Sequence, residues 1–350
     1  MGLIRILLIA DTHLGFDLPF RPRIRRRRRG PDFFANFRRA LLPALRAQVA
    51  AVVHGGDLLY RSKVPPQLVE MAFEPLRQVA DAGIPVYLVP GNHERSAIPH
   101  GHLTVHPNIF LFDHPRTFML ETQKGSLALA GFPFVRSAIR REFSGRVAQT
   151  GWQRVKADAH ILCIHQAVDG ATVGPAGFTF RHTPDVVRAA DIPRGFSAVA
   201  AGHIHRFQLL TRDLKGNLLT APVFYPGSIE RTSFAERNEK KGYLTLEFDP
   251  QGPAAAKLQN WQFHELPARP MIQMQMQVTG MNGRQIQTWI QSRLSEIPRD
   301  SVLQIKVHGN ISQTALRVLS APSLRALAPS TMNIDAIREA VDEIILELKR

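Results

Sequence analysis

The 350-residue sequence has a single cysteine, Cys163, and no apolar run long enough to cross a membrane. One cysteine excludes an intrachain disulfide, as is typical of a reducing compartment, and we interpret Cys163 as a core thiol rather than a nucleophile. The N-terminal apolar run, residues 6–10, is far shorter than the ~20 residues of a membrane helix, and no small-residue cleavage site follows it. The sequence also shows no repeat period and no heptads. These absences predict a cytoplasmic globular protein with no membrane partner.

Acidic residues are scarce relative to basic ones, because 44 Lys and Arg stand against 29 Asp and Glu, a net charge of +15. Part of this excess is concentrated in one run of Arg25, Arg26, Arg27, Arg28 and Arg29. Such a block cannot pack against itself and is expected to form a solvated arm. A general preference for surface arginine explains five in succession poorly. We therefore expect the arm to contact the phosphates of a polyanion, DNA in particular.

Polar residues follow several short apolar runs in the first two thirds of the chain. The run 86–89 ends at a Pro-Gly turn and is followed by Asn92 and His93. Runs of this kind read as buried strands, and open α/β sheets carry their chemistry just beyond such strand ends. Four other predicted strands have the same character: residues 3–10 lead to Asp11 and His13, 50–53 to Asp57, 160–164 to His165, and 196–201 to His203 and His205.

The remaining pattern predicts an α/β fold followed by a smaller α+β module. A Pro/Gly cluster at residues 249–253 is the expected boundary, which gives domains 1–250 and 251–350. Helices are predicted from Asp32, as N-cap, to residue 45 and over 67–82, with strands at 127–131, 218–223 and 242–248. The second module is predicted as strand 271–278, helix 284–294, strand 302–307 and helix 334–348.

The side chains at the strand ends are carboxylates, an amide and imidazoles, without thiolates. These donors favour Mn²⁺, Fe²⁺ or Zn²⁺ over a structural zinc cage. Eight groups are too many for one ion, whereas two ions ~3.5–4 Å apart that share a carboxylate form a clamp for displacement at phosphorus. A single His-x-His is more often structural. Five polar strand ends in one chain are difficult to explain as independent accidents, so the pattern predicts a binuclear metal site.

These motifs resemble the calcineurin-like metallophosphoesterase superfamily. The residues that carry the resemblance are Asp11-x-His13, Gly56-Asp57, Gly91-Asn92-His93-Glu94, His165 and Gly202-His203-x-His205. Finer features look like the double-strand-break repair nucleases SbcD and the YhaO-like exonucleases: residues 11–16, Asp32-Phe33-Phe34-x-x-Phe37, Gly56-Asp57-Leu58-Leu59, residues 225–231 and Lys241-Gly242-Tyr243. The resemblance covers about the first 250 residues, and many relatives carry a histidine where this chain has Tyr60.

The resemblance implies a four-layer α-β-β-α sandwich with a C-terminal capping domain, and a residue-by-residue assignment of the site. One metal ion would be held by Asp11, His13, Asp57 and His205. The other would be held by Asp57, Asn92, His165 and His203, so that Asp57 bridges the two. His93 is implied as a general acid rather than a ligand, and Glu94 either orients it, serves packing or forms a surface salt bridge.

The function expected from the resemblance is a Mn²⁺-dependent DNA exonuclease with a two-metal mechanism, acting also as an endonuclease on single strands. Two alternatives remain open: a small-molecule or cyclic-nucleotide phosphodiesterase on the same site, and a non-catalytic scaffold for DNA ends. The resemblance implies a homodimer formed through helices near residues 67–82. It also implies an SMC-like ATPase partner of the SbcC type, although the family's helical docking segment is not evident in this sequence.

Overall fold

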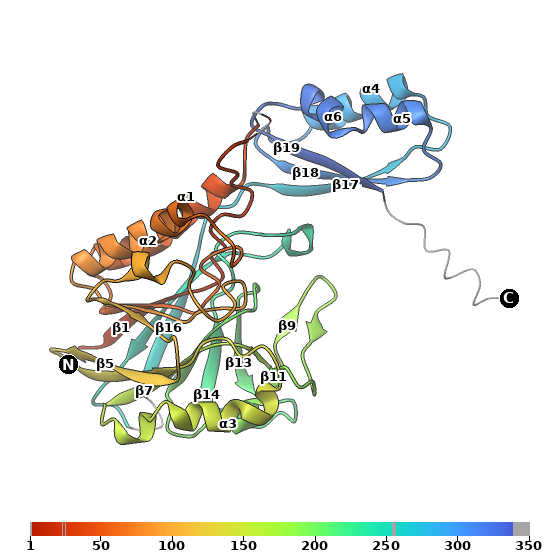
Figure 1. The fold of residues 1–350 in the computed structure, drawn as a ribbon. Coiled ribbons are helices and arrows are strands. Elements are labelled where there is room, and N and C mark those ends of the chain that lie inside the picture. Colours follow the sequence, from red (N-terminus) through yellow and green to blue (C-terminus); the bar gives the residue numbers. More distant parts are fainter. Residues whose placement is uncertain (1, 23, 25, 254–256, 339–350) are drawn as a thin grey trace. The chain divides into compact units, whose positions relative to one another are not determined.

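The computed structural model describes residues 2–22, 24, 26–253 and 257–338, and it divides into two compact units (Figure 1). Unit 1 comprises Met1–Leu18 and Arg29–Pro267, and unit 2 comprises Pro19–Arg28 and Ala268–Arg350. The boundary predicted at 249–253 lies inside unit 1, because the strand that follows it pairs with the sheet of that unit. No helix among the described residues is both long and apolar enough to span a bilayer.

The first sheet of unit 1 is mixed and has the order β16-β15-β1-β2-β3-β4. Its strands β1 to β4 are mutually parallel, β15 pairs antiparallel with β1, and the edge strand β16 pairs antiparallel with β15. Parallel strands end at the same edge, so the segments that follow β1, β2 and β3 meet there. The bounds are β1 Ile4–Ile9, β2 Ala51–His54, β3 Val86–Leu88, β4 Ile109–Leu111, β15 Gly242–Phe248 and β16 Leu258–Glu265.

The second sheet of unit 1 is also mixed, with the order β13-β14-β12-β7-β6-β5. Strands β6, β7, β12 and β14 are parallel, whereas β5 and β13 run antiparallel at the two edges. Two-stranded ladders join β8 to β11 and β9 to β10. The bounds are β5 Arg116–Thr122, β6 Gly125–Gly131, β7 Ala159–His165, β8 Ala167–Val168, β9 Thr172–Val173, β10 Phe178–Thr179, β11 Val186–Val187, β12 Ala198–Gly202, β13 Gln208–Arg212 and β14 Leu218–Tyr225.

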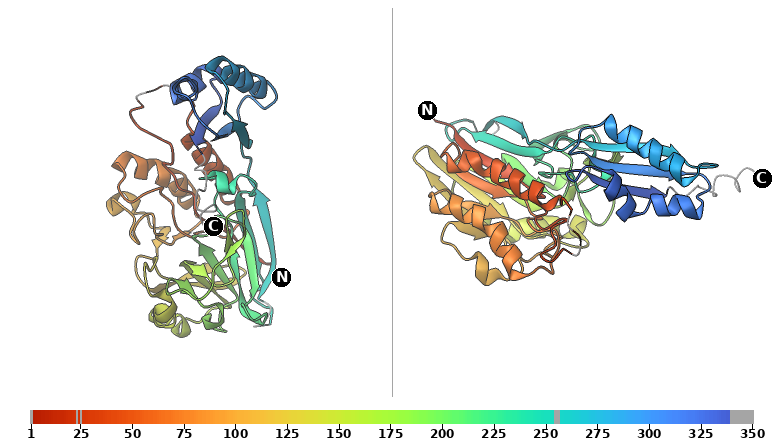
Figure 2. Two further views of the ribbon diagram at one scale, coloured as in Figure 1. Left: turned by 90° about the vertical axis from the view of Figure 1, so that its right-hand side faces the viewer. Right: turned by 90° about the horizontal axis from the view of Figure 1, so that it is seen from above.

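Three apolar clusters hold unit 1 together. One lies between the two sheets and includes Ile6 of β1 and Ile161 of β7. A second packs helices α1 (Gly30–Leu45) and α2 (Pro66–Asp81), which lie side by side, onto the outer face of the first sheet (Figure 2). The third packs helix α3 (Ile139–Gln149) onto the second sheet. Each fully buried large side chain in these clusters contributes about 1.5–3 kcal/mol. Short 3₁₀ turns are η1 Gly101–Thr104, η2 Trp152–Arg154, η3 Ala189–Asp191 and η4 Phe234–Glu236.

Unit 2 has a three-stranded sheet with the order β17-β18-β19 and helices packed on it. All of its strands are parallel, so the predicted α+β module is an α/β arrangement instead. Helix α4 begins with a capping box in which the side chain of Asn282 accepts the backbone N–H of Gln285. The bounds are β17 Met271–Gln277, α4 Gly283–Ser295, β18 Val302–His308, α5 Gln313–Val318, α6 Ala321–Leu327 and β19 Asn333–Arg338.

Two predictions from the sequence are wrong at the ends of helices. Residues 334–338 form β19 rather than a helix, because Ile334 and Ala336 alternate toward the apolar core of unit 2 while the strand pairs with β18. Residues 339–348 of that predicted helix lie outside the described residues. Helix α1 begins at Gly30 with Arg29 at its N-cap, so Asp32 is not the cap and lies in the first turn, where its charge favours the helix dipole.

Candidate metal centre

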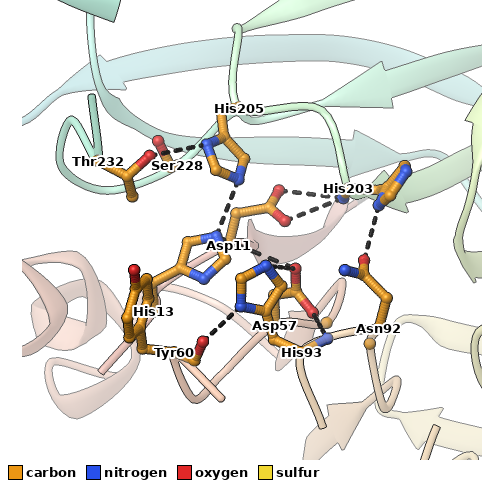
Figure 3. A network of polar contacts seen from close by, with 12 residues as sticks. Asp11, His13, Asp57, Tyr60, Asn92, His93, His203, His205, Ser228 and Thr232 are labelled. Carbon is orange, nitrogen blue, oxygen red and sulfur yellow. Dashed lines mark hydrogen bonds and ion pairs between the residues drawn. The ribbon is translucent and has the colours of Figure 1, made fainter. Parts of the chain in front are cut away.

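All eight polar residues predicted from the strand ends converge in unit 1, and all of them except His165 are labelled in Figure 3. The first sheet supplies five of them, from the segments that follow β1, β2 and β3, and the second sheet supplies three, from the ends of β7 and β12. Among the described residues, the groups of His, Cys, Asp and Glu that could hold a metal ion all fall in this cluster: Asp11–His13–His205, His13–Asp57–His93 and Asp11–Asp57–His165. Within each group the ligand atoms lie within 4.8 Å of one another.

The backbone of this cluster is strained. Asp11, His13, Asp57 and His203 have φ angles of 51°, 43°, 51° and 88°, in the left-handed region that costs a non-glycine residue about 1–2 kcal/mol. Hydrogen bonds between the two turns hold this conformation: the N–H of Asp11 donates to the carbonyl of Gly56 at 2.9 Å, and that of His13 to the carbonyl of Asp57 at 3.0 Å. Such strain is typical of functional sites, where surrounding contacts maintain it.

Two glycines of the motifs leave the space that the site residues fill. A Cβ atom on Gly91 would lie 2.2 Å from Oδ1 of Asp57, and one on Gly56 would lie 2.2 Å from Nδ1 of His165. Gly56 also has a φ of +109°. Both positions therefore require glycine, because a side chain there would displace the predicted ligand Asp57 or His165.

One half of the site brings together two histidines from different sheets. Nε2 of His13 lies 2.9 Å from Nε2 of His205. The carboxylate of Asp11 accepts the backbone N–H of His203 at 3.0 and 3.2 Å, which fixes the carboxylate beside both rings. Nδ1 of His13 is buried without a hydrogen bond in the described structure.

The other half of the site is organised around the side-chain oxygen of Asn92. This oxygen lies 2.9 Å from Nε2 of His165 and 2.8 Å from Nδ1 of His203. Asp57 lies between the two halves, because its Oδ2 is 3.4 Å from Nε2 of His165 and 4.0 Å from Nε2 of His13. A carboxylate between the two halves could be shared by two cations.

His93 lies at the edge of the cluster and is more accessible than His13. Its side chain is 33% exposed, compared with 1% for His13. Its Nδ1–H donates to the carbonyl of Tyr60, and its Nε2 lies 3.8 Å from Oδ2 of Asp57. Its backbone N–H donates to the other oxygen of Asp57 at 2.9 Å. Nε2 is thus the atom of His93 available for proton transfer.

Burial and mutual charge shift the pKa values in this cluster. Burial raises the pKa of Asp11. Burial also acts to raise the pKa of Asp57, but the charge and hydrogen bond of His165 outweigh it and lower the pKa well below its usual range. The pKa of His165 rises to about 9, because Asp57 outweighs the lowering effect of burial. A cation bound to His165 must therefore displace a proton.

The donor set fits a pair of divalent cations. It offers carboxylate oxygens, imidazole nitrogens and one amide oxygen, which suit borderline-hard ions such as Mn²⁺, Fe²⁺ or Zn²⁺. The thiol of Cys163 takes no part, because it is buried in the apolar cluster between the sheets.

Three residues that support the cluster were not predicted in these roles. His54 accepts the N–H of Gly56 at Nδ1 and contacts the hydroxyl of Thr12 with Nε2 at 3.1 Å, so it ties the two aspartate turns together. Glu94 is buried and accepts the N–H groups of Leu59 and Gly91. It therefore holds two loops in place rather than orienting His93. Glu236 contacts His205.

The arginine run is divided between the two units. Arg26, Arg27 and Arg28 belong to unit 2, and the carbonyl of Arg27 accepts the side-chain N–H of Asn333 at 3.0 Å. Arg29 belongs to unit 1, where it is buried, donates to the carbonyl of Arg231 and lies 3.6 Å from Glu230. Arg29 is therefore held in a structural contact. Arg25 lies outside the described residues.

A strained cluster of carboxylates and imidazoles at the strand ends of two packed sheets is typical of a metal-dependent phosphoesterase. Residues 4–207 match the model of the family described as calcineurin-like phosphoesterase. This match covers more than half of the chain, which therefore belongs to that family and is a metallophosphoesterase hydrolase. The match confirms the family that the motifs indicate.

Distant relatives of this chain share one name, DNA double-strand break repair protein Mre11. The relative from Aeropyrum pernix is 26% identical over 78% of this chain, and the one from Haloferax volcanii is 28% identical over 87%. These matches span 64% and 61% of the relatives' own lengths. The relative from Archaeoglobus fulgidus is 24% identical over 96% of this chain and 75% of its own length.

Proposed function

We propose that this chain is a Mn²⁺-dependent DNA nuclease, chiefly an exonuclease and also an endonuclease on single strands, that acts in double-strand-break repair. The observation that supports this most is the placement of His93 at the accessible edge of a buried cluster of seven candidate ligands. The name shared by the relatives points to DNA as the substrate, and the basic run at Arg26–Arg28 is suited to its phosphates.

The site residues divide into two cation-binding sets. Asp11, His13 and His205 would hold one cation, Asn92, His165 and His203 would hold the other, and Asp57 would belong to both sets. When bound, the pair of cations supplies Lewis-acid activation of the phosphodiester. The Nδ1–H of His93 is committed to the carbonyl of Tyr60, so proton transfer takes place at Nε2. The ring acts as a general acid in its imidazolium form, protonated at both nitrogens, and returns to the neutral Nδ1–H form when it gives its Nε2 proton to the leaving oxygen.

The two units take separate roles in this proposal. Unit 1 is the nuclease domain, with the four-layer α-β-β-α architecture of its family. Unit 2 is a capping domain that carries Arg26, Arg27 and Arg28 toward the DNA backbone, where contacts give little base specificity. We also propose a cytoplasmic location, a homodimer and an SMC-like ATPase partner of the SbcC type.

A comparison of His93→Gln with the wild-type chain tests the proposal. End-labelled linear DNA and a nitrophenyl phosphodiester are incubated with each protein, with and without Mn²⁺. We expect Mn²⁺-dependent DNA cleavage that falls by about 10²–10⁴-fold in the variant, with metal content unchanged. His114→Gln, which changes an exposed histidine outside the cluster, is the matched control and should cleave like the wild type. Hydrolysis of the small diester without DNA cleavage would overturn the choice of substrate, and equal cleavage by His93→Gln would overturn the role of His93.

A further inference from the structure

The imidazole of His205 is hydrogen-bonded to the buried carboxylate of Glu236, which has no role in the proposed chemistry. Nδ1–H of His205 donates to Oε1 of Glu236, in η4, at 3.1 Å. The hydroxyl of Thr232 donates to the same oxygen at 2.6 Å and lies beside the His205 ring (Figure 3). With Nδ1 carrying the proton, the lone pair of Nε2 points toward His13.

A buried lysine compensates the charge of Glu236. Nζ of Lys241 lies 2.7 Å from Oε2 of Glu236 and donates to the carbonyl of His205 at 2.8 Å. The Lys241 side chain is 0% exposed and also contacts Glu239 at 3.0 Å. Removing one partner of a buried ion pair is costly, so Glu236 and Lys241 together fix both the ring and the backbone of His205.

Other imidazoles of the site are supported differently. His165 donates its Nδ1–H to the carbonyl of Gly55 at 2.8 Å, and His93 donates to the carbonyl of Tyr60. A neutral carbonyl orients a ring, whereas a carboxylate orients it and also makes the opposite nitrogen a stronger donor to a metal ion. The two halves of the site therefore differ in their support: a carboxylate orients His205 in one half, whereas a carbonyl orients His165 in the other.

We propose that Glu236 is a positioning residue that sets the affinity of one cation site only. The affected site is the one formed by Asp11, His13 and His205 with Asp57. The site formed by Asn92, His165 and His203 does not depend on Glu236. The inference rests on the proposed pair of cation sites but does not depend on DNA being the substrate.

Mn²⁺ titration of the full chain after chelator treatment tests this inference, with calorimetry for affinity and electron paramagnetic resonance for the spin-coupled pair. Glu236→Gln keeps an oxygen within reach of His205 but removes the charge. Glu236→Asp keeps the charge for Lys241 but withdraws it from the ring. We expect each variant to weaken one of two Mn²⁺ sites by about 10–100-fold and to leave the other unchanged, with the coupled signal lost at limiting Mn²⁺.

Glu239→Gln is the matched control, because Glu239 contacts Lys241 and Arg206 and makes no contact with the His205 ring in the described structure. It should bind two Mn²⁺ ions with wild-type affinities. Two unchanged sites in the Glu236→Asp or Glu236→Gln chain would overturn the inference, as would equal weakening of both sites. A wild-type chain that binds no Mn²⁺ would instead contradict the proposed function, and this inference with it.

Discussion

The Nε2 atoms of His13 and His205 lie 2.9 Å apart, although the residues are 192 positions apart in the sequence. Two imidazole lone pairs cannot face each other at this distance without repulsion, so a proton or a cation must accompany them. Asp11 offers a carboxylate to the same space. This pair joins the two sheets at the proposed metal centre.

Binding of Mn²⁺ should release protons. The pKa of His165 is raised to about 9, because the nearby Asp57 carboxylate outweighs burial, so the ring is protonated at pH 7.5. A cation that takes Nε2 must expel about one proton, and Mn²⁺ affinity should rise with pH up to about 9. Calorimetric titration in buffers of different ionisation enthalpy measures this release. Binding heats that are independent of the buffer would contradict the prediction.

His54 should make the metal-free chain sensitive to acid. Burial lowers its pKa from 6.5 to about 3. The unfolded chain therefore takes up the proton first, and the free energy of unfolding falls as the pH drops from about 6.5 toward 3. The contribution of His54 is roughly a few kcal/mol. Urea denaturation across this range should show a flatter pH dependence for His54→Gln than for the wild type, and parallel curves would show that another group is responsible.

Gly91→Ala should abolish metal binding without unfolding the chain. The added methyl group would lie 2.2 Å from Oδ1 of Asp57, the carboxylate shared by both cation sets. Gly145→Ala in α3 is the matched control, because nothing lies within 4 Å of its added methyl group. The control should bind metal normally and gain about 0.5–1 kcal/mol of stability. Metal analysis measures the metal content and thermal melting measures the stability of each variant. Normal metal content in Gly91→Ala would show that this position tolerates a side chain.

The arginines that pack with unit 2 should govern the salt dependence of DNA binding. Each phosphate contact contributes about 0.9 to the slope of log affinity against log salt. Replacing Arg26, Arg27 and Arg28 with Ala should reduce the slope by up to about 3, whereas the same triple change to Lys should keep it. Fluorescence anisotropy at several salt concentrations measures the slope. An unchanged slope in the Ala variant would place the phosphate contacts elsewhere.

The strands that carry the site could be predicted because each is a short buried run. The strands β1, β2, β3, β7 and β12 all appear within two residues of their predicted ends. Strand β16 could not be found in this way, because it is an edge strand with mostly exposed side chains and no apolar run. The helix predicted at 334–348 failed over residues 334–338, since pairing with β18 overrides local preference.

The convergence of the site residues follows from parallel strands that end at a common edge, and it was therefore predictable. The supporting residues were not. Glu236 reaches His205 across 31 positions, and the contact depends on how the loop after β14 folds back. His54 directly follows the predicted strand 50–53, yet its role depends on two turns packed against it. Such contacts have no periodic signal in the sequence.

We propose that side chains at the strand ends of two sheets together bind a pair of divalent cations. Anomalous scattering from crystals grown with Mn²⁺ tests it most directly. We expect two peaks about 3.5–4 Å apart, with Asp57 bound to both, His205 on one side and His165 on the other. A single peak, or manganese bound away from Asp57, would contradict it.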